Sequence, residues 1–362
     1  MNKINETIAK IEKIDYSLTE KTQKRLDSLT KPQGSLGRLE EIAKTIVEIT
    51  ANENPSLKNK VIFTLAADHG VAKEGVSAFP QEVTPQMVYN FVAGGAGINV
   101  LARHAGARVV VVDMGVAKQL TVDCSQSTDF KTKKIDFGTK NMIKGPAMTK
   151  EEAVRSIEAG IEVFEEELPK GIDIIGTGDM GIGNTTPSSA IATCFTGRPV
   201  EELTGRGTGI NDEGYQNKIA LIKKALEVNK PDPRDVIDVL SKVGGFEIGG
   251  LAGVILAAAS RRIPIVIDGF ISAAGALIAY HLEPTVRDYL IAAHSSVEQG
   301  HKIVLAHMRL AALLDLNLRL GEGTGSALAM NIIEAAIKIL TQMATFKSAS
   351  VSEKIDETKV ET

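Results

Sequence analysis

The stretch Val61-Ile-Phe-Thr-Leu-Ala-Ala-Asp-His-Gly70 sets the pattern for most of the chain. An apolar and largely β-branched run ends in acidic residues, histidine or glycine, and a helix-like segment follows it. The pattern recurs in the apolar runs at residues 108–112, 172–175, 263–267 and 289–293. Continuous apolar strands that alternate with helices are typical of a parallel sheet covered by helices on both faces. The sequence therefore predicts an α/β fold.

Between and beyond these runs, apolar residues recur at helical spacing. We expect helices over residues 4–29, 38–52, 83–104, 149–167, 186–196, 213–229, 233–242, 246–260, 271–281, 296–313 and 326–345. Because the terminal helices flank the α/β part, we expect residues 1–57 and 326–362 to pack as a small helical domain. Residues 58–325 would form the α/β domain that carries the functional site.

The composition is that of an ordinary globular protein, with 43% hydrophobic and 24% charged residues among 362. A net charge of −4 and the absence of tryptophan argue against a nucleic-acid partner. Two cysteines, Cys124 and Cys194, are too few for a disulfide framework and fit a reducing compartment. The first residues contain no apolar signal segment, and the apolar runs are interrupted before membrane length. We therefore expect a cytoplasmic protein with no membrane partner.

Two glycine-rich segments and one isolated carboxylate indicate the chemistry. Glycines recur at residues 176–183 and again at 205–209, and Lys218 follows the second segment. Glycine backbone and a nearby lysine suit a phosphate monoester, above all where a helix begins. Glu322 lies between glycines ahead of another helix-like run. These features indicate group transfer from a phosphorylated sugar, although an exposed glutamate in a helix-capping loop would give the same local pattern.

Other chemistries fit the sequence less well. Gly176, Gly178 and Gly181 match the dinucleotide-binding spacing, but the third glycine does not open the next helix. A metal-dependent hydrolase stays an alternative, because acidic and histidine residues follow several strands; they are Asp68, His69, Asp113, Asp268 and His294. However, the chain has no H-x-H or H-E-x-x-H pairing. A non-catalytic nucleotide-binding regulator is the third possibility, and Glu322 beside a phosphate site argues against it.

Several longer motifs, in a fixed order, resemble the nicotinate-nucleotide:dimethylbenzimidazole phosphoribosyltransferases of the cobalamin lower-ligand pathway. They are Lys31-Pro-Gln-Gly-Ser-Leu-Gly-Arg-Leu-Glu40, Ala67-Asp-His-Gly-Val71, Glu74-Gly-Val76, residues 176–187 with their Asn-Thr-Thr-Pro, Asp238-Val-Leu-Ser-Lys-Val-Gly-Gly-Phe246, Pro264-Ile-Val-Ile-Asp-Gly-Phe270 and Arg319-Leu-Gly-Glu-Gly-Thr-Gly325. The matching segments run through almost the whole chain.

The resemblance implies transfer of phosphoribose from nicotinate mononucleotide to 5,6-dimethylbenzimidazole, with inversion at C1′. The pyridinium group leaves C1′ as nicotinate, whose ring nitrogen is then neutral, so the leaving group needs no general acid. One base therefore suffices, whereas glycosidases need two carboxylates. The resemblance assigns that base to Glu322. It also implies a homodimer with a Rossmann-like parallel sheet and a small helical domain from both chain ends. No cofactor and no metal are expected.

The resemblance further assigns two sets of binding residues. Those expected at the phosphate and ribose are Gly176, Gly178, Gly181, Gly205, Gly207, Gly209, Lys218 and Ser296. Those expected around the benzimidazole are Ser77, Phe79, Gln86, Met87, Asp179 and Leu320. Asp179 departs from the usual family pattern, which has glutamate there. A carboxylate shorter by one methylene would shift the aromatic base or admit a water.

Overall fold

The computed structural model describes residues 2–122 and 129–353. The chain divides into two compact units, one of residues 1–13 and 58–330 and the other of residues 14–57 and 331–362. Residues 1–13 belong to the larger unit because α1 (Asn2–Ile8) packs against α6 (Lys150–Glu167) and α11 (Phe246–Ala259). The domains expected from the sequence, residues 1–57 with 326–362 and residues 58–325, stay a prediction.

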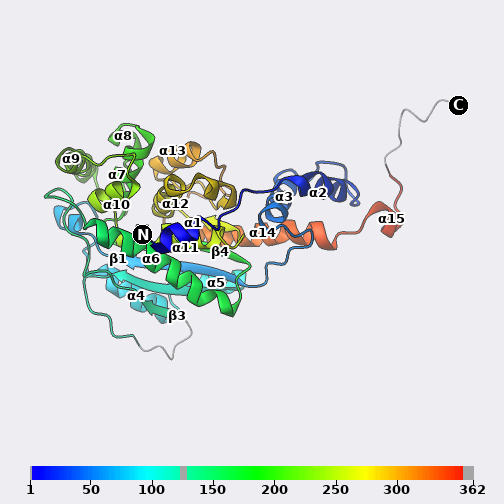
Figure 1. The fold of residues 1–362 in the computed structure, drawn as a ribbon, viewed down its shortest axis with the longest axis horizontal. Helices are drawn as coiled ribbons and strands as arrows, with labels where there is room; N and C mark the ends of the chain where they lie inside the picture. Colours follow the sequence, from blue (N-terminus) through cyan, green and yellow to red (C-terminus); the bar gives the residue numbers. More distant parts are fainter. Residues whose placement is uncertain (1, 123–128, 354–362) are drawn as a thin grey trace. The chain divides into compact units, whose positions relative to one another are not determined.

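A six-stranded parallel sheet forms the centre of the larger unit, with helices packed around it (Figure 1). Its order is β3-β2-β1-β4-β5-β6, the order of doubly wound nucleotide-binding folds. This confirms the predicted α/β class with a Rossmann-like sheet. The strands are β1 (Lys60–Ala67), β2 (Ala107–Gly115), β3 (Asp129–Thr132), β4 (Ile174–Met180), β5 (Ile265–Ile267) and β6 (Leu290–Ala292).

Strand β1 has two parallel neighbours, β2 and β4, and every one of its residues is buried. Helix α11, whose residues are also all buried, packs on β1, β2, β4 and β5, and α6 packs on α11. The α6–α11 contact is close because a Cβ at Gly160 would overlap the backbone of Gly250. The apolar run of residues 61–66 therefore forms the middle of the core.

The larger unit contains most of the helices. They are α1, α4 (Val83–Val92), α5 (Gly97–Ala105), α6, α7 (Thr185–Thr196), α8 (Val200–Leu203), α9 (Asp212–Asn229), α10 (Val236–Val243), α11, α12 (Phe270–Leu282) and α13 (Gln299–His307), with the 3-10 turns η1 (Gly70–Glu74), η2 (Leu168–Lys170) and η3 (Pro284–Tyr289). None of the helices in the described residues combines the length and the apolar character that a membrane crossing requires.

The smaller unit is helical. It contains α2 (Ser17–Asp27), α3 (Arg38–Thr50) and α15 (Phe346–Ala349), and the long α14 (Thr324–Gln342) starts in the larger unit and ends here. Both chain ends contribute, since the backbone N–H of Thr30 donates to the carbonyl of Ala344 at 3.0 Å. Lys31, in the loop before α3, forms a buried ion pair at 2.8 Å with Glu40 in the first turn of that helix.

Four predicted elements differ from the structure. The helix expected over residues 296–313 spans only Gln299–His307. Residues 4–29 form two helices, and the carboxylate of Asp15 accepts from the backbone N–H of Ser17 where the second begins. Residues 83–104 also form two helices, because Gly94 takes a left-handed φ of 77° between them. Strand β4 continues through the first part of the glycine segment to Met180, whereas the sequence predicted a loop from Gly176.

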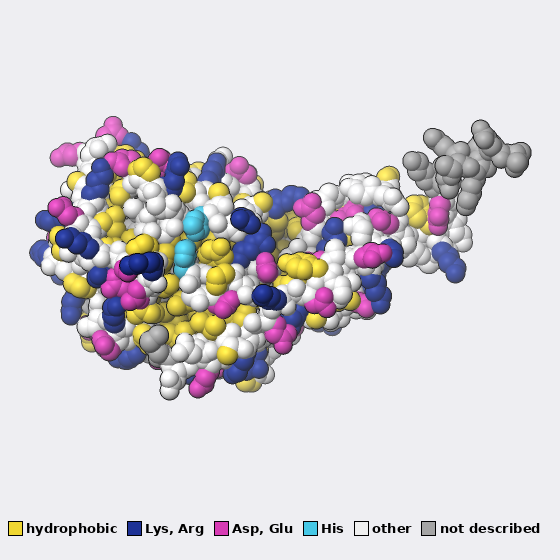
Figure 2. All heavy atoms as spheres, turned by 45° about the horizontal axis from the view of Figure 1, so that its top comes forward, with side chains coloured by type: hydrophobic (Ala, Val, Ile, Leu, Met, Phe, Trp, Pro, Cys, Tyr) yellow, Lys and Arg dark blue, Asp and Glu magenta, His cyan; other side chains and the backbone are white. Residues whose placement is uncertain are grey.

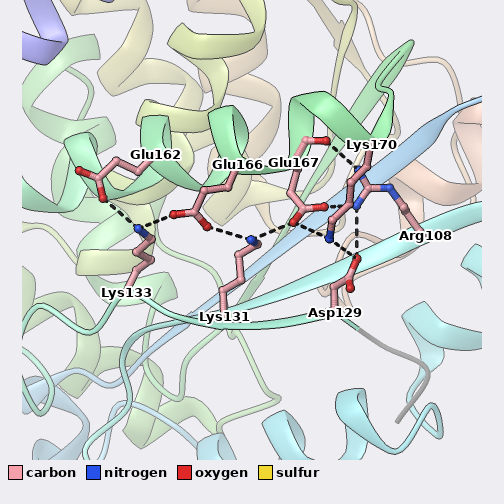
Figure 3. Close-up of polar contacts among 8 residues, drawn as sticks. All are labelled: Arg108, Asp129, Lys131, Lys133, Glu162, Glu166, Glu167 and Lys170. Carbon is pink, nitrogen blue, oxygen red and sulfur yellow. Dashed lines mark hydrogen bonds and ion pairs between the residues drawn. The ribbon is translucent and has the colours of Figure 1, made fainter. Parts of the chain in front are cut away.

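The edge strand β3 was missed because it is short and polar, and charged side chains attach it to α6 (Figure 3). Lys131 and Lys133 bridge to glutamates of that helix at 2.7–2.9 Å. The buried carboxylate of Glu167 pairs with Arg108, Lys131 and Lys170. These pairs cover one edge of the sheet with charge, which disfavours pairing with a further strand. Cys194 is a free thiol, and Cys124 lies outside the described residues.

Candidate active site

A pocket opens at the carboxyl ends of the parallel strands, where such sheets bind ligands. Its wall comes from the end of β4, from segments that follow β1, β5 and β6, and from two further loops. The wall residues are Val76, Ser77, Asp179, Met180, Gly181, Ile182, Gly183, Asn184, Thr185, Gly207, Thr208, Gly269, Phe270, Ile271, His294, Ser296, Glu298, Arg319, Leu320 and Gly321. The predicted position of the site at this edge is therefore where the structure has its pocket.

Glu322 is the next residue in the chain after the wall residue Gly321, in the loop that leads into α14, and is not itself a wall residue. Its side chain is buried, and Oε2 accepts a hydrogen bond from the backbone N–H of Ile98, in the first turn of α5, at 3.0 Å. Burial raises the pKa of Glu322, and the hydrogen bond from Ile98 opposes the rise. A raised pKa makes the carboxylate a better proton acceptor. The carboxylate does cap a helix, but it is not the exposed glutamate of the capping alternative.

Asp179 stands beside the Glu322 loop near the end of β4. Its Oδ2 accepts from the side-chain amide of Asn184 at 3.0 Å, and its carbonyl accepts from the backbone N–H of Glu322 at 3.2 Å. Burial raises the pKa of Asp179 well above its ordinary value, and the charges of Asp268 and Glu247 raise it further. The structure thus brings together two of the carboxyl groups that the sequence singled out.

Lys218 extends from α9 toward the second glycine segment. The side chain is fully buried, and Nζ donates to Thr185 Oγ1 at 2.6 Å and to the carbonyl of Gly205 at 3.3 Å. Burial lowers the pKa of Lys218 to about 8, and the charge of Glu298 opposes the drop. Glu298 in turn accepts from the backbone N–H of Gly207 at 2.9 Å. Lys218 itself lines neither cavity, but it contacts Thr185 of the pocket wall and Gly205 of the adjoining cavity. A cation behind a hydroxyl and glycine backbone is a combination that suits a phosphate.

The predicted phosphate glycines fall into two groups. Gly181 and Gly207 line the pocket, and Gly205 and Gly209 line an adjoining cavity that shares Gly207, Glu298 and Arg319 with it. Gly176 and Gly178 lie inside β4, away from both cavities. A Cβ at Gly176 would lie 2.8 Å from Ser326 Cβ, and one at Gly178 would lie 2.6 Å from Gly323 N. These two glycines therefore make room for the start of α14.

Residues expected around an aromatic base also divide. Ser77, Asp179 and Leu320 line the pocket, and Ser77 Oγ lies 3.1 Å from Thr208 Oγ1, which connects the two loops. Phe79 is 53% exposed and is not part of the wall. Gln86 and Met87 lie on α4, also outside the wall.

The structure adds wall residues that sequence reasoning did not select. Asn184 and Thr185 stood in the quoted Asn-Thr-Thr-Pro motif, and Arg319 stood in the motif around Glu322, so a signal was present for these three. Thr208 stood within the glycine segment at residues 205–209, whereas Glu298 had no local signal. Glu298 accepts from the backbone N–H of Gly207, so its place in the wall depends on how the segment after β6 meets that loop.

The strand-end acidic and histidine residues have separate protein partners. His69 Nε2 lies 2.7 Å from Glu247 Oε1, Asp113 pairs with Lys134 at 2.9 Å, and Asp68 accepts from the backbone N–H of Ala117. Over residues 2–122 and 129–353, no three His, Cys, Asp or Glu side chains converge as metal ligands would. The hydrolase alternative gains no support from this arrangement.

Comparison with known proteins identifies the family. A family model described as phosphoribosyltransferase matches residues 11–351. The nicotinate-nucleotide–dimethylbenzimidazole phosphoribosyltransferases of Geobacter sulfurreducens and Desulforudis audaxviator are each 57% identical to the chain, over 98% of it and 99% of theirs. The crystal structure of the Thermus thermophilus enzyme of that name superposes with a TM-score of 0.88 at 41% identity, covering 94% of this chain and all of the other. The chain belongs to the nicotinate-nucleotide–dimethylbenzimidazole phosphoribosyltransferase family.

Proposed function

We propose that the chain transfers the 5-phosphoribosyl group of nicotinate mononucleotide to 5,6-dimethylbenzimidazole. The products are nicotinate and α-ribazole 5′-phosphate, a precursor of the lower ligand of cobalamin. Family membership supplies the substrates. The observation that carries the mechanism is Glu322, a buried carboxyl with a raised pKa directly after the pocket wall.

The reaction breaks the bond between C1′ and the pyridinium nitrogen, and the bonding electrons neutralise the ring. One benzimidazole nitrogen attacks C1′ from the opposite face, which inverts the configuration. Glu322 removes the proton from the other nitrogen, so the benzimidazole ring is neutral once its new bond to C1′ has formed. The leaving group requires no acid because its departure discharges it.

Lys218 and the glycine segment hold the phosphate in this proposal. The ammonium group replaces its contacts to Thr185 and Gly205 with charge-assisted hydrogen bonds to phosphate oxygens. Gly181, Gly205, Gly207, Gly209 and Ser296 complete that side. Gly176 and Gly178 act through the shape of the α14 start, since neither lines a cavity.

Asp179, Ser77 and Leu320 form the side that receives the aromatic base. Leu320 is 60% exposed and offers an apolar surface to a planar ring. Burial raises the pKa of Asp179, which favours the protonated form, and a protonated carboxyl donates a hydrogen bond. Phe79, Gln86 and Met87 lie outside the wall, and their contact with the base stays an expectation from the resemblance.

The direct test is to mix nicotinate mononucleotide with 5,6-dimethylbenzimidazole and measure nicotinate release. Glu322→Gln removes the proton acceptor and should lower kcat about 10²–10⁴-fold. Glu227→Gln, at an exposed position on α9, is the matched control and should leave kcat unchanged. Release at the wild-type rate from Glu322→Gln would remove this residue from the mechanism.

We further propose that the enzyme is a cytoplasmic homodimer. Hydrophobic side chains gather on the visible face of the larger unit (Figure 2). Large exposed apolar residues also occur within a few positions of wall residues in the sequence. They are Phe79, Val297, Leu316 and the wall residue Leu320. Exposed apolar patches mark interaction surfaces, and an identical second chain is the commonest partner. Cell fractionation tests the location.

A further inference from the structure

The backbone around Glu322 is held in an unfavourable conformation. Gly321, Glu322 and Gly323 all have positive φ, at 79°, 64° and 100°. Two of these positions are glycine, which tolerates the left-handed region, but Glu322 has a Cβ. Left-handed backbone is unfavourable for a residue with a side chain, because Cβ then comes too close to the following carbonyl oxygen. Such a conformation persists only where the surroundings hold it, and it is common at functional sites.

Two strands hold the backbone of Glu322 itself. Thr64 Oγ1, from the middle of β1, donates to the carbonyl of Glu322 at 2.8 Å. The N–H of Glu322 donates to the carbonyl of Asp179 on β4 at 3.2 Å. Thr64 pairs with Gly178 in the sheet, and a Cβ at Gly178 would overlap the carbonyl of Glu322. The loop thus rests directly on the β1–β4 pair.

A third strand end holds the residues after Glu322. Asp268 follows β5, is fully buried, and accepts three backbone hydrogen bonds from the loop and the first turn of α14. Its Oδ2 accepts from Gly323 at 3.1 Å, and its Oδ1 accepts from Gly325 at 2.7 Å and from Ser326 at 3.1 Å. A carboxylate has enough lone pairs for three donors, whereas an amide oxygen with its NH₂ has not.

We propose that Thr64 and Asp268 are positioning residues that hold the Glu322 carboxylate where it removes the proton of the incoming base. The inference rests on the proposed role of Glu322. Neither side chain is part of the pocket wall, so both act through the backbone of the loop. Thr64 sets the position of the Glu322 carbonyl, and Asp268 sets the start of α14. Together they stabilise the left-handed residue and pre-organise the base.

Thr64→Val is the principal test, because valine keeps the shape and loses the hydroxyl donor. A displacement of about 1 Å costs on the order of 10²-fold in rate, so we expect kcat to fall roughly 10- to 100-fold. KM for nicotinate mononucleotide should change little, since the phosphate contacts are elsewhere. Thr64→Ser keeps the donor and should restore most of the rate. If Thr64 had a purely structural role, the loss of kcat in each variant would follow the drop in its melting temperature.

A double-mutant cycle then separates this inference from the proposed function. If Thr64 acts through Glu322, Thr64→Val slows the wild-type enzyme but causes no further loss in Glu322→Gln. Wild-type kcat in Thr64→Val, or the same fold-loss in both backgrounds, would overturn the positioning role. An undiminished rate in Glu322→Gln alone would instead overturn the base assignment.

Asp268→Asn provides the second test if Thr64→Val does not fold. The NH₂ group must then face one of the three donors, so kcat should fall with KM again nearly unchanged. The same cycle with Glu322→Gln applies. Equal losses in both backgrounds would show that Asp268 stabilises the fold without positioning the base.

Discussion

At the scale of single residues, Gly178 shows how a missing side chain shapes the site. Alanine there would place Cβ against the carbonyl of Glu322 and 2.6 Å from Gly323 N, closer than real Cβ contacts. We expect Gly178→Ala to displace the Glu322 loop and lower kcat more than tenfold. A misplacement of a catalytic group by about 1 Å costs on the order of 10²-fold in rate. Gly197→Ala is the control, because Gly197 has positive φ, unlike Gly178, but has open space where the new Cβ would lie. That variant should lose stability, by about 1 kcal/mol, and keep its rate.

The raised pKa of Glu322 predicts the acid side of the pH profile. A base works in its ionised form, so the rate falls as the pH drops through this pKa. Because burial raises the pKa above the ordinary value of 4.5, the midpoint of the fall should lie above pH 4.5. Measuring kcat/KM in steps from pH 4.5 to pH 8 gives the midpoint. The residual activity of Glu322→Gln should lack this limb, and an identical limb there would assign the titration to another group.

Lys218 predicts the alkaline side of substrate binding. Its pKa of about 8 means that the unliganded enzyme loses the ammonium charge as the pH rises through that value, despite the opposing charge of Glu298. Affinity for nicotinate mononucleotide should then fall about tenfold one pH unit above the pKa. Lys218→Arg stays charged and should show a flat profile over this range. Calorimetric titrations at pH 7, 8 and 9 measure the affinity of both proteins for nicotinate mononucleotide. If the affinity changes equally with pH in the wild type and in Lys218→Arg, Lys218 does not bind the phosphate.

At the scale of elements, five of the six strands were predictable because each overlaps an apolar run in the sequence. The sixth, β3, is Asp129-Phe-Lys-Thr132, and its position depends on ion pairs with α6 that no local pattern reveals. The end of β4 was also missed, because glycines normally indicate a loop. Gly176 and Gly178 stay in the strand since α14 packs where their side chains would be.

The β3 ion pairs make a prediction about stability. Glu167 is fully buried and binds Arg108, Lys131 and Lys170, so Glu167→Gln leaves three cations without their shared partner. We expect the free energy of unfolding to fall by about 1.5–3 kcal/mol in urea titrations. Glu162→Gln removes an exposed partner of Lys133 on the same helix and should cost less than about 1 kcal/mol. Equal losses from the two variants would contradict this account.

At the scale of the whole molecule, the position of the site was predictable and its supports were not. Parallel topology brings the carboxyl ends of all strands to one edge, so the edge that carries the site follows from the strand pattern. Glu322 was singled out by its position between glycines, and the roles of Glu322 and Asp179 came from the family resemblance. Thr64 and Asp268 were read as a strand residue and a metal ligand candidate. Their contacts to the loop join segments 258 and about 55–58 positions apart in the chain, beyond any local pattern.

The proposed homodimer is testable at this scale. Sedimentation equilibrium should give twice the mass of one chain at micromolar concentration. Leu316→Glu and Leu320→Glu place charge on exposed apolar positions and should shift the equilibrium toward monomer if these residues lie in the interface. The matched control is Val228→Glu, an exposed apolar residue on α9. A single chain mass for the wild type at all concentrations would contradict the proposal.

The hydrogen bond between Thr64 and Glu322 also has a consequence for the timing of synthesis. The ribosome makes Thr64 258 residues before its partner, which takes roughly 13–50 s at 5–20 residues per second. During that interval β1 and β4 can pair, but the Glu322 loop, which packs on Gly178, has not yet been made. Nascent chains stalled before residue 322 would therefore have all six strands but no base, and turnover would begin only after the rest of the chain is made.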